Sequence, residues 1–309
     1  MPQIKYISFQ TEQSSVISEA NILCLGNFDG VHYENRTLLR EARKLQTEKM
    51  PHALCGVFCF AELSADFLSS NPPKHLTTLE DKLRRFAEEG MDFAFVADFA
   101  ELKDLSPEEF VNDILIGQCN CKAALCGYNY RFGKGGRGTY KTLQELLAPQ
   151  PVITAAPIYM DGDTVSSTRI RGLLNKGNVK EANKLLTVPY SITAPVTHGK
   201  GLGHQMGTPT FNQLPPAKIL IPARGVYLTR CVIDGSAHFG LTNIGIRPTV
   251  DTDAHINLET HLLDFSGDLY QKELTVEFLD YIRPEKQFDS IEALQNQIKQ
   301  DINAAKERL

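Results

Sequence analysis

The sequence predicts an α/β domain with a parallel sheet, followed by a small closed β-barrel domain that carries a terminal helix. Two patterns along the chain support this prediction. Over roughly the first two thirds, short apolar runs alternate with amphipathic helical segments, whereas from about Tyr190 strand-like runs follow one another with few helices between them. Pro189 marks the change, and we expect the two domains to span residues 1–186 and 187–309.

The first domain opens with a buried-strand run at residues 22–25. After it, Leu38, Leu39, Ala42 and Leu45 recur at helical spacing. Helix starts and strands then alternate: a capping box at Thr77-x-x-Glu80, a strand at 93–97, an N-cap with proline at Ser106-Pro107-Glu108-Glu109, and a strand at 123–126. This order is typical of a parallel sheet with helices on both faces.

The second domain contains a series of strand-like runs and one terminal helix. The runs lie at residues 191–196, 226–233, 238–243, 257–263 and 273–279. Asp234-Gly235 predicts a hairpin turn between the second and third of these strands. Asp289-x-x-Glu292 predicts a helix cap, and the apolar face of that helix would consist of Ile291, Leu294, Ile298 and Ile302. A barrel with one helix laid against it accounts for this pattern.

Composition and charge narrow the class of function. The net charge of −5 and the isoelectric point near 5.9 disfavour a nucleic-acid or anionic-membrane partner. The chain has no run of about eighteen apolar residues and no cleavable signal, so we expect a cytoplasmic protein. Its seven cysteines are an odd number and lack zinc-site spacing, which favours buried, reduced thiols. Small molecules are the expected partners, and the oligomeric state is left open.

Three separated segments of the first domain carry residues suited to binding a phosphate. The first runs from the strand through Gly26, Phe28, Asp29 and His32 to Asn35 in the next helix. Backbone N–H groups and a cationic donor can face an anion at such a helix N-terminus.

The second and third segments are a glycine-rich loop and a helix start. The loop at 127–138 includes Gly127, Asn129 and Arg131, and a flexible surface loop is the alternative interpretation. The third segment consists of Ser166, Ser167, Thr168, Arg169 and Arg171. Its hydroxyls would cap a helix and its arginines would donate to phosphate, whereas a capped surface helix with solvated arginines is the alternative.

In this order and at about this spacing, the three segments resemble the adenylyltransferase domain of bacterial bifunctional FAD synthetases. In the second domain, glycines followed by Pro209-Thr210-x-Asn212 resemble the riboflavin kinase signature, and segments 225–227, 243–249, 258–265, 267–270 and 283–285 continue the match. The chain is identified as a member of the bifunctional riboflavin kinase/FAD synthetase family, over nearly its whole length. The resemblance implies a Rossmann-like nucleotidylyltransferase domain before a riboflavin kinase barrel, with ATP, riboflavin and FMN as substrates.

The resemblance also implies a kinase site that depends on ATP and Mg²⁺. The loop glycines Gly199, Gly201 and Gly203 would let backbone N–H groups close on the ATP phosphates. Thr210 and Asn212 would supply hard oxygen ligands to Mg²⁺. Glu259 would act as general base on the ribityl hydroxyl of riboflavin, and a solvated strand carboxylate is the alternative for this residue.

The sequence departs from the family pattern mainly in the first domain. The opening motif of the family ends His-x-Gly-His, but here Glu34 stands in place of the glycine and Asn35 in place of the second histidine. A Phe-Asp-Pro-His-Pro segment is also missing, because residues 58–62 are Phe-Cys-Phe-Ala-Glu. In the kinase motif, Leu202 and His204 replace arginines, and the ring of Phe211 must find space beside the expected metal ligands.

These departures leave three functional hypotheses. The favoured one is an active riboflavin kinase whose adenylyltransferase domain is impaired, because Glu34 adds bulk and negative charge beside the triphosphate. The second is a fully bifunctional enzyme that makes FMN and FAD. The third is a first domain that binds a flavin or nucleotide as a regulatory module without chemistry of its own.

Overall fold

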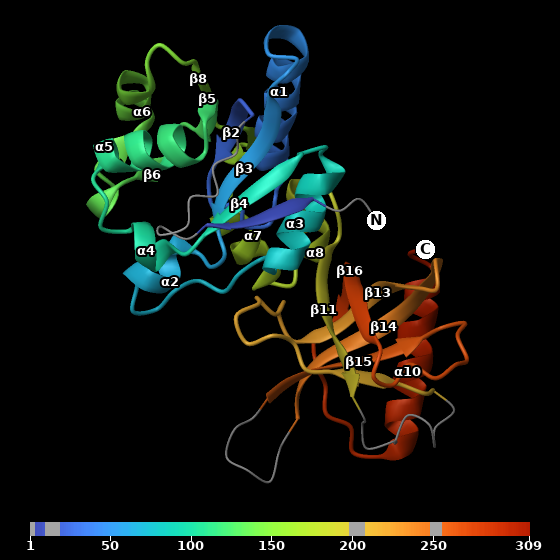
Figure 1. Ribbon diagram of the computed structural model, residues 1–309. Coiled ribbons are helices and arrows are strands. Elements are labelled where there is room, and N and C mark those ends of the chain that lie inside the picture. Colours follow the sequence, from blue (N-terminus) through green and yellow to red (C-terminus); the bar gives the residue numbers. More distant parts are fainter. Residues whose placement is uncertain (1–3, 10–18, 198–207, 248–254) are drawn as a thin grey trace. The chain divides into compact units, whose positions relative to one another are not determined.

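The computed structural model describes residues 4–9, 19–197, 208–247 and 255–309 (Figure 1). The chain divides into two compact units, Met1–Ser167 and Thr168–Leu309. Helix α7 (Ser167–Leu174) starts at this division, and α8 (Val179–Leu186) belongs to the second unit.

The first unit is built on a six-stranded sheet with the order β1-β4-β3-β2-β5-β8. Its strands are β1 (Lys5–Phe9), β2 (Asn21–Leu25), β3 (Leu54–Phe60), β4 (Phe93–Ala97), β5 (Cys121–Gly127) and β8 (Val152–Ala155). All neighbouring strands pair in parallel. The predicted α/β class is therefore confirmed, and the carboxyl ends of the strands lie along one edge of the sheet.

Helices cover both faces of this sheet (Figure 1). They are α1 (Tyr33–Lys49), α2 (Ser64–Leu68), α3 (Leu79–Glu88), α4 (Phe99–Leu102), α5 (Pro107–Glu109) with its π-helical continuation η1 (Phe110–Gln118), and α6 (Tyr140–Leu147). Leu39 of α1 and Phe86 of α3 pack in one core, while Leu115 of η1 and Leu143 of α6 pack in the other. The minor elements are β6 (Arg131–Phe132), η2 (Lys134–Gly136), β7 (Gly138–Thr139), β9 (Tyr159–Met160) and β10 (Asp163–Thr164).

The helix caps agree with the sequence at one position and differ by one residue at two. Ser106 is the N-cap of α5, as predicted, and it forms a capping box with Glu109. Helix α3 is capped by Thr78 and not by Thr77, whose hydroxyl is engaged elsewhere. The terminal helix α10 (Ile291–Lys306) is capped by Ser290, which accepts the N–H of the residue three positions later, and not by Asp289.

The second unit is a closed six-stranded barrel, as predicted, with the order β11-β12-β15-β14-β13-β16. Its strands are β11 (Tyr190–Thr197), β12 (Phe211–Gln213), β13 (Gly225–Ile233), β14 (Ser236–Arg247), β15 (His255–Leu262) and β16 (Glu273–Arg283). Asp234 and Gly235 form the β13–β14 turn with positive φ angles of 50° and 83°. The sequence pattern missed β12, because a strand of three residues is too short to show periodicity.

The two faces of the barrel strands differ in their neighbours. Inside, the hydroxyls of Thr229, Thr242 and Thr260 form a buried hydrogen-bonded row. Outside, Val226, Leu228, Leu241 and Ala305 form a small core between the strands and α10, with Ile302 packed against it. At the other end of the predicted apolar face of α10, Ile291 is 69% exposed, so the helix covers the barrel mainly through its last turns.

Asn183 is one of the residues that connect helix α8 to the barrel. Asn183 Nδ2 donates to the main-chain oxygen of Phe278 at 2.8 Å, and its Oδ1 accepts the N–H of Tyr190 at 2.7 Å. Because Tyr190 begins β11 and Phe278 lies in β16, this side chain bridges two adjacent strands of the barrel.

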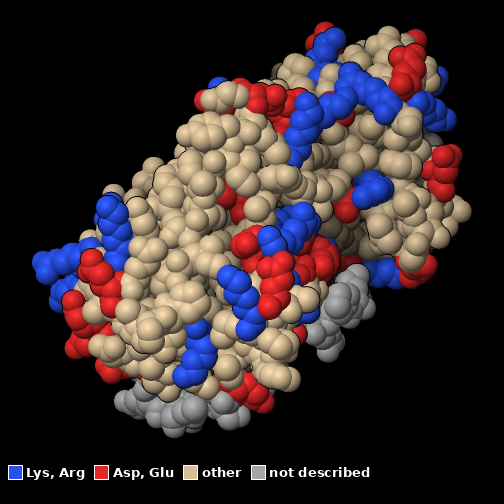
Figure 2. Space-filling view, turned by 90° about the horizontal axis from the view of Figure 1, so that it is seen from above, with Lys and Arg blue, Asp and Glu red and all other residues tan. Residues whose placement is uncertain are grey.

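All seven cysteines are buried and unpaired, as predicted. In the described ranges, no helix is long and apolar enough to cross a membrane. On the face shown in Figure 2, basic and acidic side chains are interspersed, and they do not form one basic surface.

Candidate active sites

The turn between β2 and α1, residues 26–32, is held in a strained conformation. Phe28 and Val31 have φ angles of 50° and 41°, in the left-handed region that favours glycine, and Gly30 lies there at 88°. Both non-glycine side chains are buried, and Phe28 packs edge-on against Phe86 with ring centroids 5.4 Å apart. Strain of this kind persists where the surroundings enforce it, and it is concentrated at functional sites.

Side chains from outside the turn enforce its shape. Thr77 Oγ1 accepts the N–H of Gly30 at 3.1 Å, and Asp29 Oδ1 accepts the N–H of Leu76 at 2.9 Å. Arg85 donates to the main-chain oxygen of Gly30 at 2.7 Å, and burial lowers the pKa of this guanidinium to about 10. The N–H of Gly30 is therefore engaged within the protein, and the first turn of α1 is the end that can face an anion.

Ser167 connects the third predicted segment to the first. Its Oγ donates to the main-chain oxygen of Asp29 at 2.9 Å. The hydroxyl that was expected to cap α7 thus holds the strained turn. Ser166, just before the helix, is half-buried. Thr77 and Arg85 were missed as partners of this turn, because their spacing is explained equally well by an ordinary helix start.

Glu34, in the first turn of α1, points toward the second predicted segment. Its carboxylate accepts the N–H of Ile158, and a Cβ placed on Gly127 would lie 3.9 Å from Glu34 Oε1 and 3.2 Å from Asn129 Oδ1. Burial raises the pKa of Glu34, against the opposing effect of the Ile158 hydrogen bond. Close by in α1, the buried Oδ1 of Asn35 accepts no hydrogen bond from the described residues. A carboxylate therefore lies where the family pattern has a glycine.

The segment at residues 58–62 is apolar where the family pattern carries a histidine. Phe58 is buried, and Phe60 packs edge-on against Phe99 with centroids 5.1 Å apart. Lys82, which is only 3% exposed, donates through Nζ to the main-chain oxygen of Phe60 at 2.9 Å. A buried ammonium group thus lies at the carboxyl end of β3, the sheet edge where α/β folds bind ligands. A lysine within a helical pattern is normally solvent-exposed, so no pattern in the sequence points to this position.

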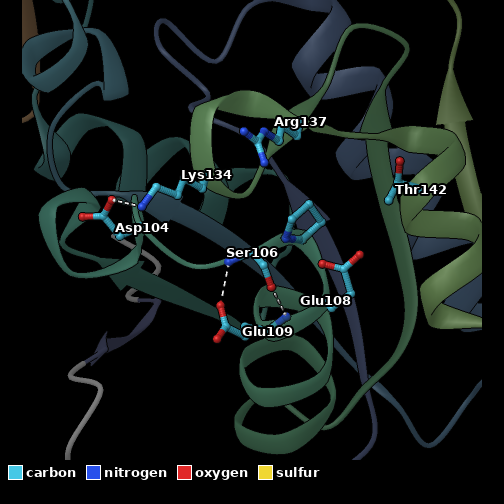
Figure 3. Close-up of a pocket in the computed structure, with 8 residues that line it drawn as sticks. Asp104, Ser106, Glu108, Glu109, Lys134, Arg137 and Thr142 are labelled. Carbon is cyan, nitrogen blue, oxygen red and sulfur yellow. Dashed lines mark hydrogen bonds and ion pairs between the residues drawn. The ribbon is translucent and has the colours of Figure 1, made fainter.

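The side chains of the glycine-rich loop are divided between two places. Gly127 and Asn129 lie near Glu34, whereas Lys134 and Arg137 belong to a pocket of about 400 Å³ (Figure 3). The rest of that pocket is lined by Asp104, Ser106, Pro107, Glu108, Glu109 and Thr142. Lys134 pairs there with Asp104 at 3.2 Å, so the pocket is mixed in charge.

The remaining residues predicted for the first site lie on β6, in α7 and just before α1. Arg131 is exposed on β6. Thr168 is exposed in the first turn of α7, and Arg169 and Arg171 are half-buried in the same helix. His32 is buried at the position before α1.

In the second unit, three predicted residues come together on the outer face of the barrel. Asn212 of β12 lies opposite Glu259 of β15, and Thr210 Oγ1 donates to Glu259 Oε1 at 2.8 Å. The residues next to Glu259, Leu258 and Thr260, are fully buried, so Glu259 faces outward by the alternation of a strand. The barrel register thus brings a hydroxyl, an amide and a carboxylate into one cluster.

Phe211 does not crowd this cluster. It lies opposite Thr260 and is buried, on the face of β12 away from Asn212. The expectation that its ring needs space beside the metal ligands is therefore wrong, because consecutive strand residues point to opposite faces. Gly199, Gly201 and Gly203, together with Leu202 and His204, lie outside the described residues.

The donor set of the cluster fits Mg²⁺. Hydroxyl, amide and carboxylate oxygens are the hard ligands that this ion takes together with water and phosphate. Among the described residues, no group of three or more His, Cys, Asp or Glu side chains could hold a metal ion. Thr210 and Asn212 are thus suited to an ion that takes most of its other ligands from a bound nucleotide and water.

Comparison with known proteins agrees with this two-part organisation. Residues 14–169 match the family model described as FAD synthetase, and residues 186–309 match the model described as riboflavin kinase. The fold and these matches define a two-domain transferase of flavin nucleotide synthesis. The chain belongs to the bifunctional riboflavin kinase/FMN adenylyltransferase family, which confirms the resemblance seen in its motifs.

The similarity extends over most of the chain in several relatives. The chain is 36% identical to the bifunctional riboflavin kinase/FMN adenylyltransferase of Pseudomonas fluorescens, over 92% of each chain. It is 33% identical to that of Escherichia coli K12, over 95% of this chain and 94% of the relative. A crystal structure described as a macrolide-efflux protein from Streptococcus pneumoniae matches with a TM-score of 0.90 at 28% identity, covering 98% of this chain and 99% of the other.

Proposed function

We propose that this protein is a cytoplasmic enzyme whose second unit transfers the γ-phosphoryl group of ATP to riboflavin, giving FMN and ADP. The observation that carries the proposal is the cluster of Thr210, Asn212 and Glu259, within residues 186–309 that match the riboflavin kinase model. The names of the relatives supply the substrate class, and the hydroxyl, amide and carboxylate groups of the cluster suit a small, hydroxyl-bearing acceptor.

The cluster suggests a role for each residue. Glu259 accepts the proton of the terminal ribityl hydroxyl as that oxygen attacks the γ-phosphorus. Thr210 donates a hydrogen bond to this carboxylate and so holds it in place beside the proposed metal ligands. Thr210 and Asn212 would hold Mg²⁺, which supplies charge neutralisation on the nucleotide phosphates when bound.

For the first unit, we propose that FMN adenylylation is slow. Glu34 supports this proposal, because its partly buried carboxylate lies at the start of α1 and near Gly127, where a triphosphate would need positive or neutral neighbours. Two histidines of the family pattern are also absent, because residue 35 is an asparagine and the segment 58–62 contains no histidine. Losing one charged donor to a transition-state oxyanion costs about 3 kcal/mol, or about a hundredfold in rate.

Full bifunctionality is the second candidate. The relatives at 31–36% identity carry that description, and buried Lys82 offers a cation at the carboxyl end of β3 that could take over the role of a missing histidine. In the third candidate, the first unit binds a flavin or nucleotide without chemistry of its own.

One incubation separates the first two candidates. The protein is mixed with riboflavin, ATP and Mg²⁺, and FMN and FAD are resolved by chromatography. We expect FMN to accumulate with little FAD. FAD formed at a rate comparable to FMN would favour the bifunctional enzyme, and no FMN would overturn the kinase assignment. Calorimetric titration with FMN in the presence and absence of ATP then tests the binding module.

A further inference from the structure

Three alternate residues of β15 face the segment 209–212, which carries the proposed metal ligands. Beside the Glu259 contact with Thr210, Asn257 Nδ2 donates to Asn212 Oδ1 at 2.7 Å. His261 Nδ1 lies 2.9 Å from the main-chain oxygen of Pro209. A carbonyl oxygen only accepts, so this ring nitrogen carries the proton. Residues 257, 259 and 261 share one face of the strand, and each holds a different point of the segment 209–212.

Asn257 is the least expected of the three. Its side chain is 8% exposed, its Nδ2 is used by Asn212, and its Oδ1 is buried and accepts no hydrogen bond from the part of the chain that the structure describes. A buried acceptor without a partner costs about 1–3 kcal/mol. The stability of the fold therefore does not explain an amide at this position. The hydrogen bond that its NH₂ group donates to Asn212 does explain it.

We propose that Asn257 and His261 are positioning residues of the kinase site. Asn257 fixes the amide of Asn212 so that its oxygen stays directed at the metal, and His261 fixes the backbone just before Thr210. The inference rests on the proposed kinase function, and it assigns residues that neither touch the reacting atoms nor belong to the glycine, Pro-Thr-x-Asn or general-base positions.

The hydrogen bond from Asn257 controls the orientation of the Asn212 amide. An amide side chain turns over easily unless a hydrogen bond favours one of its two faces, and metal ligands depend on such supporting bonds. The bond from Asn257 Nδ2 selects the orientation in which Asn212 Oδ1, and not its NH₂ group, points to this side. Because a carbonyl oxygen has two lone pairs, Asn212 Oδ1 can accept this bond and still bind an ion.

The first test is Asn257→Asp, which keeps the size of the side chain and removes the donor. The carboxylate repels Asn212 Oδ1 and attracts its NH₂ group, so the amide of Asn212 turns over. We expect binding of manganese-ADP, followed by electron paramagnetic resonance, to weaken by about tenfold or more. The added negative charge alone would predict tighter binding of manganese-ADP, because a carboxylate attracts the cation. Unchanged or tighter binding overturns the proposal.

Asn243→Asp is the matched control. Asn243 of β14 lies opposite Glu259 in register, so this change adds the same charge beside the cluster without removing the donor to Asn212. We expect its manganese-ADP binding to be equal to the wild type or tighter. If both variants lose binding alike, added charge explains the effect and the positioning role of Asn257 is wrong.

The second test concerns His261. His261→Ala should raise the apparent KM for magnesium-ATP several-fold with the melting temperature nearly unchanged, and His261→Asn should restore most of the loss because its Nδ2 can donate from a similar position. Equal defects in both variants would overturn the proposal that His261 holds the backbone at Pro209. A wild-type protein that makes FMN while these variants bind normally refutes only the positioning roles, whereas a wild-type protein that makes no FMN refutes the kinase function itself.

Discussion

Thr210 Oγ1 lies 2.8 Å from Glu259 Oε1, although the two residues are 49 positions apart in the chain. The contact unites the two motifs to which the kinase chemistry is assigned, one on the segment before β12 and the other on β15. It also places the proposed base next to a proposed metal ligand, so a proton leaving the acceptor and the charge on the phosphates are handled within one cluster.

The first prediction concerns the base. Glu259→Gln retains size and polarity but cannot accept the proton, so kcat for riboflavin phosphorylation should fall by about a hundredfold or more while the KM for riboflavin changes little. Steady-state kinetics measure both. Glu277→Gln is a suitable control, because this carboxylate pairs with Arg230 elsewhere on the barrel. Near-full turnover of Glu259→Gln would show that another group accepts the proton.

The second prediction concerns adenylylation in the first unit. Glu34→Gly with Asn35→His should raise FAD formation from FMN and ATP by much more than either change alone, because groups in one site act together. Asn35→His alone should help little while Glu34 remains beside Gly127. Exposed Glu41→Gln on the same helix controls for charge. If the unmodified protein already makes FAD as fast as FMN, the proposed impairment is wrong.

The third prediction follows from the raised pKa of Glu34. Burial raises this pKa above its ordinary value of 4.5, so the ionised carboxylate is less favourable in the folded than in the unfolded chain. The protonated Glu34 side chain therefore contributes its full stabilisation of the folded state below the ordinary pKa. This stabilisation is lost as the pH rises through the raised folded-state pKa. The melting temperature of Glu34→Gln should equal that of the wild type near pH 4 and exceed it at pH 7. A wild type with a higher melting temperature than Glu34→Gln at pH 7 would contradict this prediction.

The fourth prediction concerns independent folding of the barrel. Residues 187–309 hold the six strands, α10 and the kinase cluster, and we expect them to fold alone and to phosphorylate riboflavin. A fragment from residue 168 should melt at a higher temperature, because it keeps Asn183, which bridges β11 and β16. In the full chain, Asn183→Ala leaves the N–H of Tyr190 without its partner and should cost about 1–3 kcal/mol. An aggregated shorter fragment would show that the barrel needs the preceding helices.

The fifth prediction contrasts two glycines. A Cβ on Gly56 in β3 would lie 2.1 Å from the ring of Phe93, so Gly56→Ala should destabilise the protein by about 1–3 kcal/mol through overpacking. Helical Gly172 has open space at the same position and an ordinary φ, so Gly172→Ala should be neutral or stabilise by up to about 1 kcal/mol. Thermal unfolding compares them, and a tolerated Gly56→Ala would mean that Phe93 moves aside freely.

Local patterns were enough to predict most elements and the fold class, and the family resemblance singled out the residues of the proposed kinase cluster. Periodicity predicted the alternation of strands and helices before Tyr190 and the strands of the barrel, because hydrophobic spacing reports secondary structure directly. Caps were less certain: Thr77 and Asp289 each stand one residue before the true cap, since neighbouring hydroxyl and carboxylate side chains fit the same pattern. Strand β12 gave no signal because three residues show no period.

Which side chains meet was decided by packing between distant segments. The barrel register places Asn212 opposite Glu259 and turns Phe211 inward, and no local spacing contains that register. Likewise, the fold buries Lys82 against Phe60, engages Thr77 with Gly30 and directs Glu34 to the N–H of Ile158. The chain's motifs specify which chemical groups are present, whereas their mutual distances arise only when the sheets and helices close over a common core and fix each backbone segment against its neighbours.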